Sequence, residues 1–117
     1  MSQTNCDYLL TIQGQLASGN LQAGRALHNE TAGAPANVTA AKSLGDLSHN
    51  VYVPMDPAQA ASGQLLFLDM WSSLDGLNQF FSVPQVQEQA GHIFSQRDPV
   101  IWEPAEGFFN YHLTTPY

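Results

Sequence analysis

The chain of 117 residues carries ten carboxylates and only three cationic side chains, which gives a formal net charge of −7 at pH 7. This balance would repel a phosphate backbone, so we expect no nucleic-acid partner. The sequence also lacks a basic and apolar leader and any apolar run of membrane-spanning length, so we expect a cytoplasmic protein with no membrane partner. An even composition over this length predicts one domain across residues 1–117.

The first part of the chain predicts a strand followed by a helix. Apolar and polar residues alternate over residues 6–13, as is typical of a strand, and Gly14 is expected to end it. Apolar residues recur at helical spacing over residues 16–31. The Ala-rich stretch 33–46 is interrupted by Gly and Pro, so we expect a long connection there with at most one or two helical turns.

Two further strands are predicted in the middle of the chain. The alternation over residues 47–53 places four side chains on one face: Leu47, His49, Val51 and Val53. A short connection over residues 55–63 predicts antiparallel pairing with the next strand, residues 64–71. That strand is apolar on both faces, so both faces of its sheet need a cover.

Residues 72–94 predict a helix in two parts. Ser72 with Asp75, and Ser82 with Gln85, have the spacing of a capping box, and Pro84 is tolerated in the first turn of a helix. We therefore expect a break near Ser82. The buried stripe of the second part is predicted to be Val86, Ala90, Ile93 and Phe94.

The end of the chain predicts a turn at residues 98–99, a fourth strand over residues 100–103, and a fifth short strand or arm over residues 107–113. The order β-α-β-β-α-β predicts an α+β, ferredoxin-like fold with both helices on one face of an antiparallel sheet. So short a chain has nothing left to cover the other face. We therefore expect a homodimer joined sheet to sheet, with the C-terminal arm contributing.

The motifs of the back half are similar to those of a known superfamily. An apolar strand that ends in Trp71 is followed by Ser73, by the pair Phe80 and Phe81, and by Pro84. This pattern resembles the dimeric α+β barrel superfamily and, within it, the antibiotic-biosynthesis-monooxygenase-like proteins. The resemblance implies a dimeric α+β barrel. The superfamily includes cofactor-free oxygenases, haem-degrading enzymes, isomerases and proteins of no known activity, so the fold alone does not name a reaction.

The resemblance also bears on cofactors. Haem-degrading members use an Asn, a Trp and a haem-ligating His, and these places fall here on Asp7, Phe80 and Ala90. All three residues differ, and Ala90 cannot bind iron. Cys6 is the only cysteine, and the four histidines lack the spacing of a zinc site. We therefore expect no haem, no metal and no other cofactor.

Arg25, His28 and Asn29 form the densest polar cluster of the first predicted helix. A histidine can move protons near neutral pH, and an arginine can hold an oxyanion by two parallel donors. This cluster would suit a small oxyanionic substrate, with Asn29 orienting it. The alternative is an exposed helix end, where His28 is favoured by the helix dipole.

His49 and Asp69 are the polar residues that lie among apolar neighbours in the predicted strands. We expect burial to lower the pKa of His49 below its usual value of about 6.5, which would keep it neutral, as a base must be. Asp69 lies between Phe67 and Trp71 on one strand face and must be paired or protonated there. The alternative for His49 is a hydrogen-bonded core histidine.

These residues together give one functional hypothesis and its rival. In the first, His49, His28, Arg25 and Asn29 face a common cavity that is bounded by Trp71 and Phe81 and includes Asp69. This cavity would bind a planar, apolar or oxyanionic small molecule, and the protein would act as a cofactor-independent monooxygenase or an isomerase. In the rival, the aromatic residues fill the space, and the protein is a non-catalytic binding or structural dimer.

Overall fold

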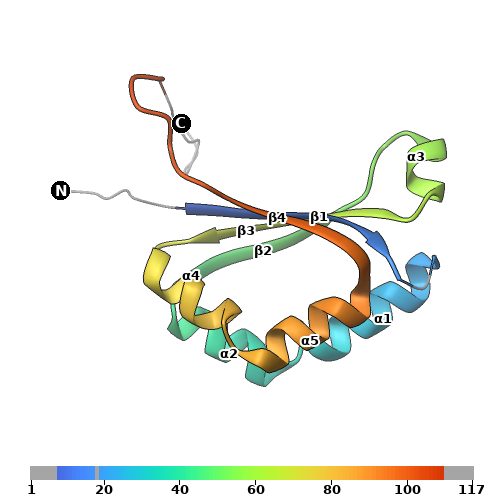
Figure 1. Cartoon of the computed structure of the whole chain (residues 1–117), viewed down its shortest axis with the longest axis horizontal. Coiled ribbons are helices and arrows are strands. Elements are labelled where there is room, and N and C mark those ends of the chain that lie inside the picture. The colour runs from blue at the N-terminus through green and yellow to red at the C-terminus, as the bar shows by residue number, and fades with distance from the viewer. Residues whose placement is uncertain (1–7, 18, 110–117) are drawn as a thin grey trace, which may run out of the picture.

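A computed structural model describes residues 8–17 and 19–109. Its elements follow in chain order: β1 Tyr8–Leu16, α1 Leu21–Thr31, α2 Pro35–Ser43, β2 Asp46–Tyr52, α3 Pro57–Ala61, β3 Gln64–Trp71, α4 Leu74–Phe81, α5 Pro84–Ile93 and β4 Phe94–Trp102. Helices α1, α2, α4 and α5 lie against one face of the sheet, whereas α3 lies beyond its end in the β2–β3 connection (Figure 1). None of the helices in the described part has the length and apolarity that a membrane span requires.

The strands form one antiparallel sheet in the order β2-β3-β1-β4. Strand β3 lies between β1 and β2, and β1 lies between β3 and β4. Each β-α-β unit is therefore split by a strand of the other unit, which is the ferredoxin-like arrangement. The predicted α+β, ferredoxin-like fold class is confirmed.

Glycine lets the first strand run further than the sequence indicated. β1 continues through Gly14 to Leu16, and a Cβ on Gly14 would lie 2.3 Å from a ring carbon of Phe94 and 2.6 Å from the carbonyl oxygen of Gln96. The prediction that Gly14 ends the strand was wrong, because this glycine serves the close approach of β4 and not a turn. The first residues of that predicted strand, 6–7, lie outside the described residues.

The Ala-rich stretch forms a helix of nine residues, α2. Pro35 occupies its first turn, where the missing N–H has no helical partner, and Gly45 follows it with a φ of 111°. The expected connection with at most two turns was therefore too short an estimate. Ala41 of α2 is buried in the core, so tertiary packing supports this helix.

The predicted break in the last helical segment is confirmed, since α4 ends at Phe81 and α5 begins at Pro84. The caps differ in detail. The hydroxyl of Ser73, one residue later than predicted, accepts a hydrogen bond from the N–H of Gly76 at 2.9 Å. The second predicted cap was wrong, because Ser82 donates its hydroxyl to the carbonyl of Gln79 instead.

β4 is much longer than predicted. It begins at Phe94, which was expected to end the helix, and it runs through residues 98–99, where a turn was expected. Pro99 is tolerated because β4 is an edge strand, where an N–H can be missing without a partner. Residues 107–109 form no strand, and the remainder of the predicted arm, 110–113, lies outside the described residues.

The two faces of the sheet differ in cover. The helix-facing side holds the core, made up of Leu10, Ile12, Leu16, Ala41, Leu65, Phe67, Trp71, Leu77, Ile93 and Phe94. In the register of β1, β3 and β4, the opposite side carries Leu9, Leu66, Leu68, Met70, Val100 and Trp102. These side chains are partly or largely exposed. The described chain therefore leaves an apolar sheet face uncovered, and we call these six residues the open face.

Candidate functional site

A β-bulge at the start of β2 places a carboxylate where the alternation of the sequence did not. Asp46 pairs with Trp71, and Ser48 pairs with Met70, so Leu47 is an extra residue. His49 then pairs with Asp69. Strict alternation would separate Asp46 from His49, but the bulge puts both on the helix-facing side. Asp46 was therefore not predicted as a site residue, since no feature of the sequence marks the bulge.

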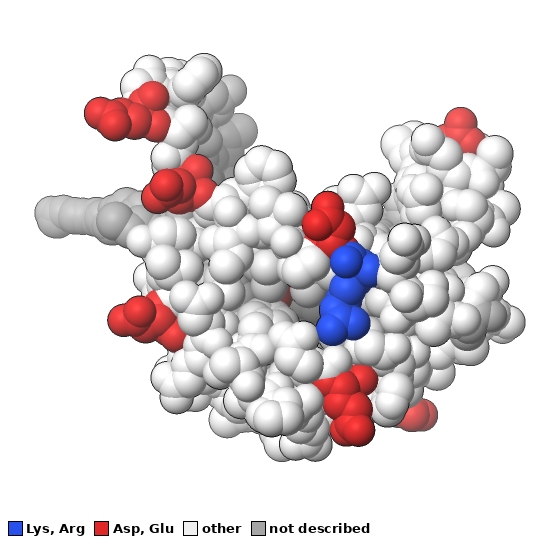
Figure 2. Space-filling view, viewed as in Figure 1, with Lys and Arg blue, Asp and Glu red and all other residues white. Residues whose placement is uncertain are grey.

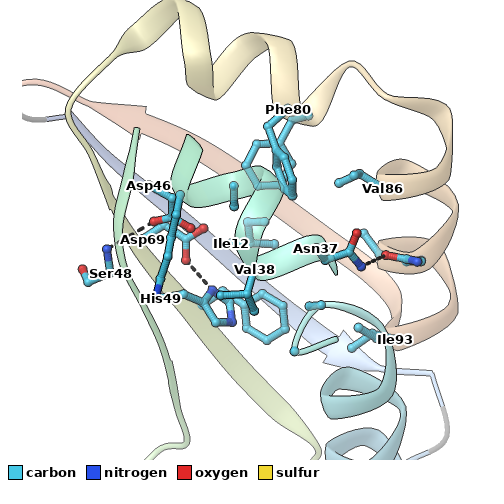
Figure 3. A pocket seen from close by; sticks show the side chains of 18 of the residues that line it. Ile12, Asn37, Val38, Asp46, Ser48, His49, Asp69, Phe80, Val86 and Ile93 are labelled. Atoms are coloured by element: carbon cyan, nitrogen blue, oxygen red, sulfur yellow. Dashed lines mark hydrogen bonds and ion pairs between the residues drawn. The ribbon is translucent and has the colours of Figure 1, made fainter. Parts of the chain in front are cut away.

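A cavity of about 330 Å³ lies between the sheet and helices α2, α4 and α5. Most of its wall is apolar, with contributions from Ile12, Val38, Phe67, Phe80, Phe81, Val86 and Ile93. Its polar lining consists of Asn37, Lys42, Asp46, Ser48, His49, Asp69 and Gln89. Figure 3 shows the polar group Asp46, Asp69 and His49 on the sheet side and Phe80 and Val86 on the helix side. We call this space the main cavity. Its shape and lining are those of a site for a small organic molecule.

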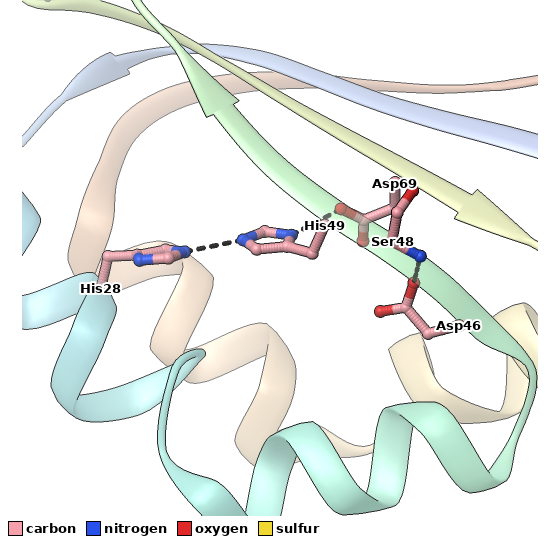
Figure 4. A network of polar contacts seen from close by, with 5 residues as sticks. All are labelled: His28, Asp46, Ser48, His49 and Asp69. Atoms are coloured by element: carbon pink, nitrogen blue, oxygen red, sulfur yellow. Dashed lines mark hydrogen bonds and ion pairs between the residues drawn. The ribbon is translucent and has the colours of Figure 1, made fainter. Parts of the chain in front are cut away.

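Four side chains, those of Asp69, His49, His28 and Asn29, form a hydrogen-bonded chain that begins at the main cavity. Figure 4 shows the first three of them. The Oδ1 atom of Asp69 lies 2.5 Å from the Nδ1 atom of His49. The Nε2 atom of His49 lies 2.8 Å from the Nε2 atom of His28, and the Nδ1 atom of His28 lies 2.9 Å from the Oδ1 atom of Asn29. Asp69 is only 5% exposed, so its charge needs such a partner. We call these residues the histidine chain.

The histidine chain is best satisfied when it carries one extra proton. With both rings neutral, His49 donates from Nδ1 to Asp69 and accepts at Nε2 from His28, which leaves the bare Nδ1 of His28 facing the Oδ1 of Asn29. With one more proton, His49 donates from both nitrogens, His28 accepts at Nε2, and its Nδ1–H donates to Asn29. The positive charge then lies beside Asp69. The neutral pair has all its hydrogen bonds only if the amide oxygen and nitrogen of Asn29 exchange places, so that Asn29 donates to Nδ1 of His28.

The pKa of His49 is raised above its usual value. Burial lowers it, but the hydrogen bond to Asp69 and the charges of Asp69 and Asp46 together outweigh burial. The expectation of a lowered pKa for His49 was therefore wrong, because the sequence did not reveal its carboxylate partner. The lowered pKa belongs to His28, where burial dominates over the hydrogen bond to Asn29.

The pKa of Asp46 is raised as well. Burial and the nearby charge of Asp69 raise the pKa of the Asp46 carboxyl to about 6, although His49 and the N–H of Ser48 act in the opposite direction. The main cavity therefore has two titratable groups, Asp46 and His49, and the pKa of each is raised above its usual value. Such groups are suited to general acid–base chemistry.

The expected common cavity is not formed. Arg25, His28 and Asn29 line a separate pocket of about 290 Å³, which we call the second pocket, whereas His49 and Asp69 line the main cavity. The two spaces are joined by the contact between His28 and His49.

Of the two aromatic residues that were predicted to bound the cavity, only one lines it. Phe81 lines the main cavity as expected. Trp71 lines neither space, because it is fully buried against Phe80 and Phe81, with ring centroids 5.7 and 6.0 Å away. Its indole nitrogen has no hydrogen-bond partner in the described structure. Trp71 is therefore a core residue at the back of the site.

Metal ligands are not gathered anywhere in the described residues. Within residues 8–17 and 19–109, no three side chains of His, Cys, Asp or Glu are placed to share a metal ion. The polar groups of the site are instead paired with one another through hydrogen bonds. What this arrangement can do by itself is take up and release a proton beside an apolar cavity.

No protein-family model and no curated protein matches this sequence. Solved structures do share its fold. SnoaB, a cofactor-independent oxygenase from Streptomyces nogalater, has a TM-score of 0.63 at 9% identity, over 95% of this chain and 100% of that chain. A hydroxynitrile lyase from Passiflora edulis has a TM-score of 0.62 at 14% identity, over 87% and 96% of the two chains. A dimeric ferredoxin-like protein from an uncultured marine organism has a TM-score of 0.61 at 10% identity, over 92% of this chain and 95% of that chain.

These likenesses confirm the predicted resemblance at the level of the fold. The described chain shares a ferredoxin-like fold with these proteins. At such identities the comparison concerns the backbone, so the chemistry has to be argued from the side chains of this chain.

Proposed function

We propose that the protein binds a small, largely apolar organic molecule in the main cavity and transfers a proton to or from it. The observation that carries this proposal is the histidine chain, which reaches the wall of an apolar cavity of about 330 Å³. Asp69 and the two histidines can share an added proton without leaving a buried charge unpaired. In its neutral form the chain can accept a proton from a carbon acid at Nε2 of His49 once the bond to His28 opens, and in its protonated form it can return one.

Two reactions begin with this step. An isomerase returns the proton to another carbon of the same molecule. A cofactor-independent monooxygenase lets the carbanion transfer electrons to O₂, so that a CH₂ group and O₂ become a carbonyl group and water. The similarity to a cofactor-independent oxygenase supports the second reaction, and the first needs no co-substrate.

The rival proposal is a non-catalytic binding or structural dimer. The packed form of this rival is disfavoured, because side chains leave the main cavity open. A binding protein without turnover differs from an enzyme in only one measurable respect, which is proton exchange on the bound ligand. That difference decides the experiment.

The test uses a bicyclic ketone such as 2-tetralone, whose protons beside the carbonyl are acidic and whose size suits the main cavity. Loss of their NMR signals in deuterated water should be faster with the protein than without it. His49→Gln and Asp69→Asn should slow this exchange by roughly 10²-fold or more, the usual range for a proton-transfer group. His92→Gln, at an exposed histidine of α5, should leave it unchanged.

Binding without accelerated exchange would reject the enzyme in favour of the non-catalytic binder. Absence of binding would reject both forms of the ligand proposal. His49→Phe, which fills a similar volume without any nitrogen, separates loss of the hydrogen bonds from loss of packing. If His49→Phe and His49→Gln keep the full exchange rate, the histidine chain has no part in catalysis.

We also propose that the protein is a homodimer joined through the open face, that residues 1–117 act as one domain, and that it works in the cytoplasm. The uncovered apolar sheet and the likeness to a dimeric ferredoxin-like protein support the dimer. The cytoplasmic proposal is supported by the single cysteine, which leaves no internal disulfide in these residues that would need an oxidising compartment.

A further inference from the structure

We infer that Asp46 meets the polar end of the ligand, and that the main cavity therefore selects a molecule whose polar end donates a hydrogen bond and rejects an organic anion. This inference rests on the proposed binding of a small organic molecule in the main cavity. It names the chemical class of that molecule and a specificity-determining residue that the sequence did not indicate.

The position of Asp46 leaves it free for a ligand. Its Oδ1 atom accepts a hydrogen bond from the N–H of Ser48 at 3.2 Å, which fixes the carboxyl group at the bulge. Its other oxygen, Oδ2, has no hydrogen bond or ion pair to any residue that the structure describes. Because Asp46 lines the main cavity and is half-buried, this oxygen is available to a bound molecule.

The neighbouring polar groups on the sheet are already engaged with one another. Both ring nitrogens of His49 have partners, Asp69 on one side and His28 on the other. The Oδ1 of Asp69 is bonded to His49, and Asp69 is almost fully buried. A ligand that enters the cavity therefore finds its most accessible carboxylate on the sheet side at Asp46. A donor on the ligand would form a charge-assisted bond there, which is stronger than a neutral one.

Asp46 itself opposes an anion in the cavity, and the charges that face it offer little compensation. From the sheet these are Asp69 and His49, which compensate each other when His49 is protonated, and from α2 there is the exposed Lys42. Helices α4 and α5 contribute aromatic, aliphatic and amide groups to the cavity lining but no charge. Arg25 belongs to the second pocket. A ligand carboxylate would lose its hydration beside Asp46 with only the exposed Lys42 to attract it.

The wider surface of the protein also disfavours anions. The formal net charge of the chain is −7. Figure 2 shows acidic side chains spread over the face in view, whereas the basic ones are confined to one small patch. An anionic ligand would be repelled on approach as well as in the cavity, and a neutral or cationic one would not.

The test compares three ligands of one shape. 2-Naphthol is a neutral donor, 2-naphthylmethylamine a cationic donor, and 2-naphthoate an anion. Their affinities are measured by calorimetry at about pH 7.5, where the raised pKa of Asp46 still leaves its carboxyl ionised. Both donors should bind tenfold or more tightly than 2-naphthoate, given the usual strength of hydrogen bonds to charged groups.

Asp46→Asn keeps the shape of the side chain and an acceptor for the N–H of Ser48, so it should fold. In this variant the preference for donors over 2-naphthoate should fall to within about threefold. The matched control is Glu88→Gln, an exposed carboxylate of α5 outside the cavity lining, which should keep the wild-type preference. At about pH 5, where Asp46 is protonated, the wild-type preference should fall as it does in Asp46→Asn.

The outcomes separate this inference from the proposed function. Equal or tighter binding of 2-naphthoate by the wild type, or an unchanged preference in Asp46→Asn, overturns the inference and leaves ligand binding in place. Failure of all three ligands and of 2-tetralone to bind overturns the proposed function and this inference with it.

Discussion

The Asp69 carboxylate decides the protonation state of His49. An imidazole that is partly buried among apolar groups would normally lose its proton easily. Here a nearly buried carboxylate lies 2.5 Å from its Nδ1 atom, and the side chain of His49 is itself 30% exposed. The cation is therefore favoured over the neutral ring. His28, which has no carboxylate within hydrogen-bonding reach in the described structure, remains the neutral partner that accepts from it.

Asp69→Asn should reverse the direction of the His49 shift. The amide cannot hold a positive charge, so burial would prevail and the pKa of His49 should fall below its usual value of about 6.5. The folded state should lose about 1–3 kcal/mol, because a charge-assisted hydrogen bond is replaced by a neutral one. The two quantities are measured by NMR titration of the histidine ring protons and by urea unfolding. A His49 that still titrates above about 6.5 in this variant would assign the raised pKa to another cause.

Asp46 predicts a pH-dependent term in stability. Its pKa is raised from 3.8 to about 6 in the folded protein, so the folded state holds a proton that the unfolded state releases. The stabilising contribution is therefore fully present below pH 3.8 and is lost as the pH rises through about 6. Asp46→Asn removes this term. The unfolding free energy of the variant, relative to the wild type, should rise between about pH 4 and pH 7.

Urea unfolding of both proteins across this range measures the difference directly, and the other titrating groups largely cancel in the comparison. A difference that stays constant from acid to neutral pH would show that the Asp46 carboxyl is not perturbed by folding.

At the scale of elements, Gly76 shows a packing requirement that overrides helix propensity. It lies in α4, where replacing glycine by alanine normally stabilises a helix by about 1 kcal/mol. A Cβ at this position would lie 1.7 Å from the carbonyl oxygen of Leu44, at the start of the α2–β2 connection. Alanine would therefore force α4 away from the segment that leads into the bulge.

We expect Gly76→Ala to lower the unfolding free energy by about 2 kcal/mol or more, since the overlap must be relieved by backbone movement. The matched control is Gly91→Ala in α5. Its Cβ would meet only a guanidinium nitrogen of Arg97 at 3.7 Å, so it should stabilise by up to about 1 kcal/mol. Urea unfolding of both variants checks the pair. If both alanine variants stabilised the protein equally, α4 would have space for a Cβ at position 76 that the structure does not show.

Local signals predicted some elements and failed at others for physical reasons. Pro84 located the break between α4 and α5, because a proline restricts the backbone wherever it stands. Phe94 continued the helical period of α5 although it begins β4, since a buried aromatic residue serves either element. The bulge at Leu47 depends on how β2 meets β3. No local sequence pattern indicates how these two strands pair. The sequence therefore predicted His49 and Asp69 as separate site residues, but it predicted neither their contact nor the presence of Asp46 in the site.

At the scale of the whole molecule, the unequal faces of the sheet are the main structural fact. The doubly apolar β3 predicted that both faces need a cover, and the described chain supplies helices for one only. The opposite side presents the open face, with Leu68 and Met70 of β3 partly exposed near its centre. Exposed apolar area of this kind is costly in water, and a second copy would bury it symmetrically.

The proposed dimer predicts that one charge on the open face separates the subunits. Leu68→Glu places a carboxylate where the two sheets would meet, and an unpaired charge in an apolar interface is strongly unfavourable. Light scattering at micromolar concentration should give a dimer for the wild type and a monomer for Leu68→Glu. Gln79→Glu adds the same charge at an exposed position of α4, on the helical side, and should remain a dimer. A wild type that is monomeric, or a Leu68→Glu variant that stays dimeric and folded, would move the interface away from this sheet face.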